Sequence, residues 1–301
     1  MYGRWILKQI VMAFCLGFLV FTIGGVALAG DPYSVFVSIL PQKYFVERIA
    51  GDEVEISVMV RPGADPATYE PSPRQMADLT KAKAYFGIGV PFETAWLDRI
   101  QSNYPGLVIV DTQAGITLRQ IEGHRHSTSQ IKGKEPHAEH LLDPHIWLDP
   151  LLVRRQGETI YKALAAINPP KASVYFENYQ RFAEDLEVLD NKIRGILDHG
   201  VGGKFMVFHP AWGYFADAYG LQQIPIELAG KEPSARELAE FIDVARREQI
   251  KIIFVQSQFN IRPAQAVAKA VGAKVVQLDP LAEDYMVNMI ATARAISEAL
   301  E

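Results

Sequence analysis

The chain has little cysteine and no excess of positive charge. Its only cysteine, Cys15, lies inside an apolar N-terminal run, so the rest of the chain forms neither disulfide bonds nor thiolate metal sites. Lysine and arginine number 30 against 35 aspartate and glutamate residues, which gives a formal net charge of −5. This balance disfavours nucleic acid as a partner. Any bound metal must therefore be held by imidazole and carboxylate groups.

The first 29 residues have the composition of an export signal. Arg4 and Lys8 precede the apolar run, which ends in the small-residue cleavage pattern Ala27-Leu28-Ala29. We predict a signal peptide that is removed between Ala29 and Gly30, which makes the protein periplasmic or otherwise extracytoplasmic. Retention of this segment as a membrane anchor is the alternative, because the run is nearly long enough to span a bilayer.

Short runs rich in β-branched and aromatic residues alternate with segments of helical spacing along the rest of the chain. The runs are 33–40, 54–60, 84–90, 107–110, 204–208, 224–228, 251–256 and 274–278. Strands that alternate with helices form parallel sheets with helices on both faces. We expect an α/β protein with two similar lobes, an N-terminal lobe over 30–166 and a C-terminal lobe over 201–301.

A long amphipathic segment separates the two series of strands. Between 171 and 200 no proline interrupts the chain, and apolar residues recur every few positions: Val174, Phe176, Tyr179, Phe182, Leu186, Leu189, Ile193 and Leu197. The pattern predicts one continuous helix that links the lobes within 167–200. A helix is stiffer than a Gly/Ser linker, so we expect no large hinge motion between the lobes.

Histidine is concentrated in one stretch of the sequence. Residues 124–145 contain five of the seven histidines, and four of these lie in the polar segment 113–142, which we interpret as a mobile surface loop. The His-rich loop would either take part in metal capture or be an incidental polar tract.

Three side chains near the ends of apolar segments are candidate metal ligands. His209 follows the run at 204–208, Asp279 follows the run at 274–278, and His145 lies in DPHIWLDP. Because the carboxyl ends of parallel strands face the same crevice, these side chains can converge. Two imidazoles and a carboxylate suit zinc, or manganese or iron with more oxygen ligands. Taken singly, His145 is an ordinary hydrogen-bonding group and Asp279 a helix cap or turn residue.

Three further side chains near these candidates have two explanations each. Glu227 would hydrogen-bond a ligand imidazole and fix its tautomer, or it is a polar residue that leaves a strand. Trp147 and Trp212 follow two of the candidates, and they would either keep the site dry or pack in an ordinary core.

Four segments resemble, in order and spacing, the metal-binding solute receptors of ABC importers for zinc and manganese. They are GADPATYEPSPRQMADLTKAKAYFGIGVPFETAWLDRI, DPHIWLDP, FHPAWGYFADAYGL and LDPLAEDYMVNMI. The resemblance implies two α/β lobes joined by a rigid backbone helix, with the metal in the cleft between the lobes. It also implies His145, His209 and Asp279 as ligands, no enzymatic activity, and a permease of the cytoplasmic membrane as partner. We expect the protein to be a monomer.

One position departs from the pattern of that family. The family places a histidine in a Pro-Gly-x-x-x-His-x-Tyr-Glu-Pro loop at the position of Ala67, and a methyl group cannot coordinate a metal. Water would leave an open site with three protein ligands. His137 or His140 of the His-rich loop would supply the missing ligand, or Asp65 or Glu70 would shift the site towards manganese or iron.

The leading hypothesis is an extracytoplasmic solute-binding protein that captures a divalent transition metal, zinc first, for an ABC permease. Binding would compete with protons for two imidazoles, so affinity should weaken below about pH 6. One alternative is a metallohydrolase with an open coordination position, although the chain has no HExxH pair and no Ser or Cys nucleophile motif. The other is a receptor-fold protein that has lost tight metal binding.

Overall fold

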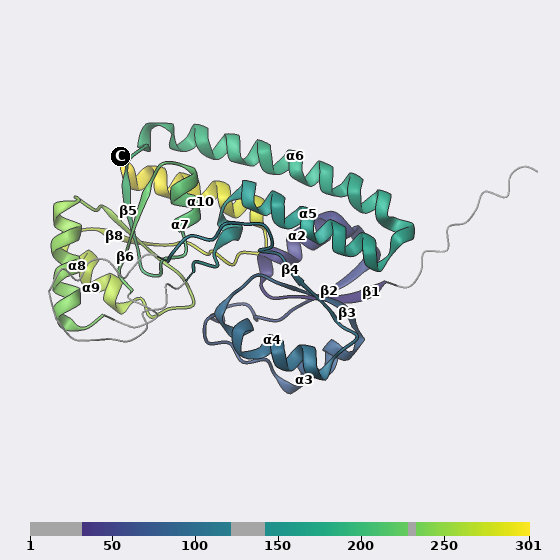
Figure 1. Cartoon of the computed structure of the whole chain (residues 1–301). Helices are drawn as coiled ribbons and strands as arrows, with labels where there is room; N and C mark the ends of the chain where they lie inside the picture. The colour runs from purple at the N-terminus through teal and green to yellow at the C-terminus, as the bar shows by residue number, and fades with distance from the viewer. Residues whose placement is uncertain (1–31, 122–141, 228–232) are drawn as a thin grey trace, which may run out of the picture. The chain divides into compact units, whose positions relative to one another are not determined.

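The computed structural model describes residues 32–121, 142–227 and 233–301, and Tyr33–Glu301 form one compact unit (Figure 1). The predicted signal peptide and the four histidines of the His-rich loop lie outside the described residues. Within the described ranges, none of the helices combines the length and apolar character needed to cross a bilayer.

The first four strands form a parallel sheet in the order β2-β1-β3-β4. The strands are β1 (Tyr33–Val37), β2 (Val54–Val58), β3 (Ala82–Gly87) and β4 (Val108–Asp111), and the helices between them are α2 (Leu40–Ala50), α3 (Pro73–Asp78) and α4 (Pro91–Asn103). Helix α2 lies on one face of the sheet, and α3 and α4 lie on the other (Figure 1). The central strand β3 is buried at all but one residue, as expected for a sheet covered on both faces.

The second four strands repeat this arrangement in the order β6-β5-β7-β8, and all of them are parallel. The strands are β5 (Lys204–Val207), β6 (Gln222–Pro225), β7 (Ile252–Val255) and β8 (Lys274–Gln277), and the helices are α7 (Gly213–Ala218), α8 (Ala235–Arg247), α9 (Arg262–Val271) and α10 (Tyr285–Leu300). The predicted α/β architecture with two similar parallel sheets is therefore confirmed.

Proline sets where many of the helices begin. Five of the described α-helices, α2, α3, α4, α5 (Pro150–Ile167) and α9, carry a proline at the first or second helical position. Proline suits this position because its fixed φ matches the helix and its missing N–H has no intrahelical acceptor there. Two of these helices, α2 and α4, begin within four residues of the preceding strand, so the connections after β1 and β3 are short and defined.

The predicted long helix is present as α6 (Ala172–Leu197), and its ends are 3-10 turns. Most of the expected apolar stripe is buried, from Phe182 to Leu197. The first turn differs from the expectation: Val174 and Phe176 are each 42% exposed, and Tyr175 is buried in their place. Tyr175 lies on the stripe because it precedes Tyr179 by four residues, whereas Val174 and Phe176 lie to either side of it.

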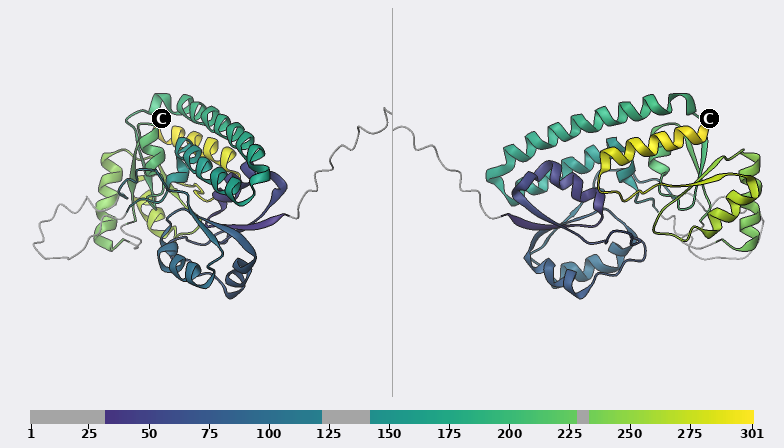
Figure 2. Two further views of the ribbon diagram at one scale, coloured as in Figure 1. Left: turned by 45° about the vertical axis from the view of Figure 1, so that its right-hand side comes forward. Right: turned by 180° about the vertical axis from the view of Figure 1, so that it is seen from behind.

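One helix, α5, was not predicted from the sequence. Asp149 caps it by accepting hydrogen bonds from the backbone N–H groups of Leu151 (2.7 Å) and Leu152 (3.3 Å), and Pro150 opens the first turn. This Asp-Pro helix start was present in DPHIWLDP. Helix α5 packs along α6, and Figure 2 shows α10 running beside α6 as well.

A single hydrophobic core extends from the first sheet through α2, α5, α6 and α10 to one face of the second sheet. Tyr285, at the start of α10, packs edge-on against Phe45 of α2 with the ring centroids 5.1 Å apart. The other face of the second sheet has a separate core with α8 and α9, which includes Phe241 and Val267. The helices therefore join both sheets into one packed body.

Candidate metal centre

His145 is oriented by a carboxylate two residues before it. Asp143 begins an Asp-Pro turn, and its Oδ1 accepts a hydrogen bond from the backbone N–H of His145 (3.0 Å). The same oxygen lies 2.7 Å from Nδ1 of the His145 ring. Asp143 is fully buried and His145 is 8% exposed. A carboxylate accepts, so Nδ1 donates to it, and in the neutral imidazole Nε2 then keeps its lone pair.

Asp143 is itself held in place by an arginine and a tyrosine. Arg119 Nη1 lies 3.5 Å from Asp143 Oδ2, and Arg119 Nε lies 2.9 Å from Asp217 Oδ2 of α7. The Tyr214 hydroxyl donates to the Asp143 carbonyl (2.9 Å) and accepts from the Arg119 N–H (3.0 Å). Burial is the main cause that raises the pKa of Tyr214 to about 12, so the hydroxyl keeps its proton at neutral pH. A side chain on Gly213 would collide with Arg119, since its Cβ would lie 1.4 Å from Nη1.

His209 is oriented by residues distant in sequence. It follows β5 after Phe208, and its Nδ1 lies 2.8 Å from Oε2 of Glu227, which is 3% exposed. The contact between Glu227 and a candidate ligand imidazole is thus present in the structure. Gln256, which follows β7, accepts from the His209 N–H (3.2 Å) and donates to the His209 carbonyl (2.9 Å). Again Nδ1 faces a carboxylate and Nε2 keeps its lone pair.

Aromatic rings enclose both imidazoles. Phe259 stacks on His209 with the ring centroids 4.7 Å apart and the planes 20° apart. Trp147, which is 1% exposed, lies against His145 with the centroids 5.1 Å apart, so it forms part of the apolar surroundings of that imidazole. Trp212 is also fully buried and packs on Phe215.

The two imidazoles face each other through their free nitrogens. Nε2 of His145 lies 3.3 Å from Nε2 of His209. If both rings are neutral with the proton on Nδ1, two lone pairs point at one another, and a proton or a metal ion between the two Nε2 atoms removes their repulsion. A tetrahedral zinc with Zn–N bonds of about 2.0–2.1 Å places two ligand nitrogens roughly 3.3–3.4 Å apart. The pair therefore has the spacing and orientation for two ligands of one metal ion.

Asp279 lies in the loop after β8 and is partly buried. Its Oδ1 accepts from the Leu281 N–H (2.9 Å) and from Gln258 Nε2 (3.4 Å). The indole N–H of Trp147 donates to the carbonyl of Pro280 (2.7 Å), so this loop contacts the His145 loop. Across the described part of the chain, no three His, Cys, Asp or Glu side chains are arranged so that they could hold a metal together. The structure thus pairs the two histidines, and Asp279 as a ligand stays a prediction.

The remaining candidates for the missing ligand are placed differently. Asp65 uses its carboxylate within its own turn, where Oδ1 accepts from the Ala67 N–H (2.8 Å) and Oδ2 from the Thr68 hydroxyl (3.3 Å). Ala67 and Glu70 are exposed. His137 and His140 lie outside the described residues.

One local motif recurs at four of the positions above. In each, an aspartate precedes a proline and its Oδ1 accepts the backbone N–H two residues later: Asp65 to Ala67, Asp143 to His145, Asp149 to Leu151 and Asp279 to Leu281. The role of Asp143 was missed from the sequence, although this Asp-Pro-His turn signals it. Ala67 occupies the same place in its turn as His145 does.

Comparison with known proteins places the chain among metal receptors. The family described as "Zinc-uptake complex component A periplasmic" matches residues 35–299. The high-affinity zinc uptake system protein ZnuA of Bacillus subtilis is 27% identical over 266 residues, which cover 86% of this chain and 82% of that protein. A putative metal-binding protein of Chlamydia muridarum is 28% identical over 285 residues, which cover 93% and 98%. A crystal structure of ZnuA superposes with a TM-score of 0.82 at 41% identity, over 90% of this chain and all of that one.

Proposed function

The chain belongs to the zinc-uptake complex component A family, a family of solute-binding receptors and not of enzymes, and on that premise we propose that it captures zinc outside the cytoplasmic membrane for delivery to an ABC permease. The observation that carries the proposal is the 3.3 Å approach of two imidazole Nε2 atoms whose Nδ1 atoms each face a buried carboxylate. The comparisons give no support to the metallohydrolase alternative.

We infer that His145, His209 and Asp279 bind the ion in a cleft between two lobes, 30–166 and 201–301, joined by the helix within 167–200. Zinc is favoured over manganese because the two donors brought together are imidazoles, which suit zinc, whereas manganese prefers oxygen. Imidazole also suits iron, and zinc is preferred to iron because the matching family and the ZnuA relative are described as zinc-uptake proteins. In place of the histidine expected at Ala67, the fourth ligand is a water or a histidine from the His-rich loop, with the Asp65 or Glu70 carboxylate as the third alternative.

The proposal includes export as a monomer, with the signal peptide removed between Ala29 and Gly30. The mass of the protein recovered from the extracytoplasmic fraction of its host tests this part. A mass that includes the first 29 residues would support an anchor instead.

The central experiment is a chelator competition titration with zinc and with manganese at pH 7.5 and pH 5, using protein that begins at Gly30. We expect tight zinc binding at pH 7.5 that weakens at pH 5, because protons compete for the imidazoles. Equal zinc affinity at the two pH values would argue against imidazole ligands, and absence of zinc binding at both would refute the proposal.

The same titration on protein lacking residues 124–140 decides what completes the site. If the deletion abolishes tight zinc binding while His145 and His209 remain, the His-rich loop supplies the missing ligand. If the affinity is unchanged, water or a carboxylate completes the site and the loop is an accessory.

A further inference from the structure

A four-residue segment contacts both of the candidate ligands that belong to the second sheet. The Gln256–Phe259 segment, with the sequence Gln-Ser-Gln-Phe, connects β7 to α9. It carries no group expected to bind zinc and was not singled out from the sequence. Three of its four side chains nevertheless touch His209 or Asp279.

Gln256 fixes the main chain of His209. Its carboxamide is 1% exposed and makes two hydrogen bonds, one to the N–H and one to the carbonyl of His209. A buried amide satisfied at both ends holds its partner at a defined distance and angle, because breaking either bond leaves a polar group unsatisfied. The Cα of His209 is therefore tied to β7 as well as to its own strand.

Phe259 fixes the ring of His209. Its near-parallel stack covers one face of the imidazole, and its edge also contacts Phe208, with the centroids 5.8 Å apart. His145 meets the same imidazole at 72° with the centroids 5.2 Å apart. Tilting the His209 ring out of this plane would break the stack, so Phe259 holds the ring plane while Glu227 fixes the edge that carries Nδ1, and together they direct Nε2 towards His145.

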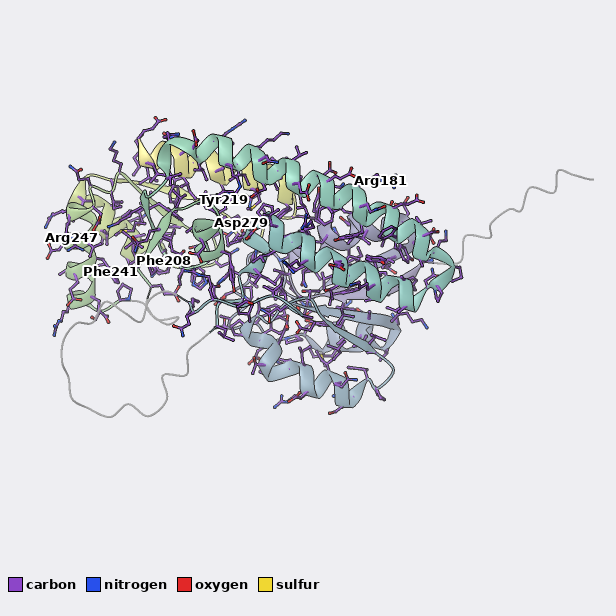
Figure 3. All side chains as sticks on the ribbon, turned by 45° about the horizontal axis from the view of Figure 1, so that its top comes forward. Arg181, Phe208, Tyr219, Phe241, Arg247 and Asp279 are labelled. Atoms are coloured by element: carbon purple, nitrogen blue, oxygen red, sulfur yellow. The ribbon has the colours of Figure 1, made fainter. Side chains whose placement is uncertain are left out.

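Gln258 acts on the other candidate ligand. Its Nε2 donates to Asp279 Oδ1, and in the part of the chain that the structure describes its Oε1 is buried without a hydrogen-bond donor. A buried acceptor without a donor is unfavourable, and a donor entering beside Asp279, such as a metal-bound water, would relieve it. Figure 3 labels Asp279 and Phe208, the residue before His209.

We propose that the Gln256–Phe259 segment is a positioning element that sets how tightly and how selectively the site holds its metal. The inference rests on the proposed function. Because one short segment restrains both an imidazole and a carboxylate, it fixes the separation of two donors that come from different loops. A fixed donor separation favours the ion whose bond lengths match it and slows the loss of that ion.

The first test compares Phe259→Leu, which removes the stacking ring, with Phe259→Tyr, which keeps it. Phe259→Leu should lower zinc affinity about 10–100-fold, in the range seen when outer-shell partners of metal ligands are lost. It should also change the visible absorption spectrum of the cobalt(II)-loaded protein, which reports ligand geometry. Phe259→Tyr should keep the original affinity and spectrum.

Phe241→Leu is the matched control. Phe241 lies on α8 and is buried in the core that this helix forms with the second sheet, against which Phe259 also packs (Figure 3). We expect this variant to lower the melting temperature and leave zinc affinity and the cobalt spectrum unchanged. If Phe259→Leu and Phe241→Leu have the same affinity and spectrum, the inference is refuted while the proposed function stands.

The second test replaces Gln258 by leucine. The variant should bind zinc more weakly and lower the ratio of zinc affinity to manganese affinity, because the Asp279 carboxylate then keeps only its hydrogen bond from the Leu281 N–H. An unchanged ratio would overturn the inference for Asp279. If the unmodified protein itself fails to bind zinc, the proposed function is refuted and this inference with it.

Discussion

His145 and His209 present the same atom in the same way, but their supports come from different distances along the chain. The carboxylate that faces His145 Nδ1 is two residues away, whereas the one that faces His209 Nδ1 is 18 residues away. The residue that clamps the His209 backbone is 47 residues away. The orientation of His145 is thus encoded locally by an Asp-Pro turn, and that of His209 exists only once the second sheet has formed.

The largest expected effect comes from removing either imidazole, because each supplies one Nε2 donor to the proposed site. His145→Ala and His209→Ala should each lower zinc affinity more than about 100-fold, because each removes a donor. Loss of a residue that only supports a ligand costs about 10–100-fold. The two losses should be similar despite the different supports. Chelator competition measures both, with His199→Ala as control, since His199 Nε2 contacts the Ser297 hydroxyl of α10 (3.3 Å). Original affinity in either variant would show that the pair does not share the ion.

Substitutions of the two supporting carboxylates should differ in their effect on stability, although they have similar effects on zinc affinity. Asp143→Asn and Glu227→Gln should each cost about 10–100-fold in zinc affinity, because a neutral amide holds the imidazole tautomer less firmly. Asp143→Asn should in addition destabilise the fold by roughly 1–3 kcal/mol, since Asp143 also pairs with Arg119. Thermal unfolding of both variants checks this difference. Equal melting temperatures would mean that the contact with Arg119 contributes nothing.

Ala67→His should strengthen binding. Asp65 already accepts the N–H of residue 67 in a turn like the one that presents His145, so the new imidazole would start from a similar backbone. Each 1.4 kcal/mol gained tightens binding about tenfold, and we expect a gain of at least this order for zinc. The competition titration measures it, with Ala67→Gln as the control of similar size. A gain for Ala67→Gln as well would point to a general effect of bulk.

The smallest expected effect comes from Gly213→Ala. The added Cβ would displace the Arg119 guanidinium from Asp143, since it would lie 1.4 Å from Nη1 and 2.9 Å from Asp143 Oδ2. Arginine is flexible, so we expect destabilisation near the lower end of about 1–3 kcal/mol and a loss of zinc affinity smaller than that of Asp143→Asn. Thermal unfolding and titration check both. An affinity loss larger than that of Asp143→Asn would mean that the methyl group disturbs the site directly.

Much of the fold could be predicted because it depends on local patterns. All eight strands and the long helix α6 are marked by runs or stripes of apolar residues that sheet or helix burial requires. Helix α5 was missed because its Asp149-Pro150 start lies inside DPHIWLDP, which was interpreted only as the segment that carries the candidate ligand His145. The start of α6 was misread because Val174 and Phe176 were placed on the apolar stripe, although Tyr175 has the four-residue spacing from Tyr179 that helix burial requires.

The candidate site was predictable only in part, because only some of its contacts arise from local sequence patterns. His145 and His209 are visible at the ends of apolar segments, and the structure brings them together. The contacts of Gln256, Gln258 and Phe259 arise because β5, β7 and β8 are neighbours in the sheet, so no short sequence motif predicts them. Asp143 lies between these cases, because an Asp-Pro-His turn is local but is easily taken for an ordinary turn.

Helix α10, the last helix described, has a consequence for the order of folding. Its first residue, Tyr285, packs on Phe45 of α2, and Glu283 just before it pairs with Lys43 of the same helix. The core around α2, which is synthesised early, is therefore complete only after α10 has been synthesised. Contacts of such high sequence separation slow folding. A nascent chain that lacks α10 should remain sensitive to protease, because the core around Phe45 is incomplete until α10 packs against α2.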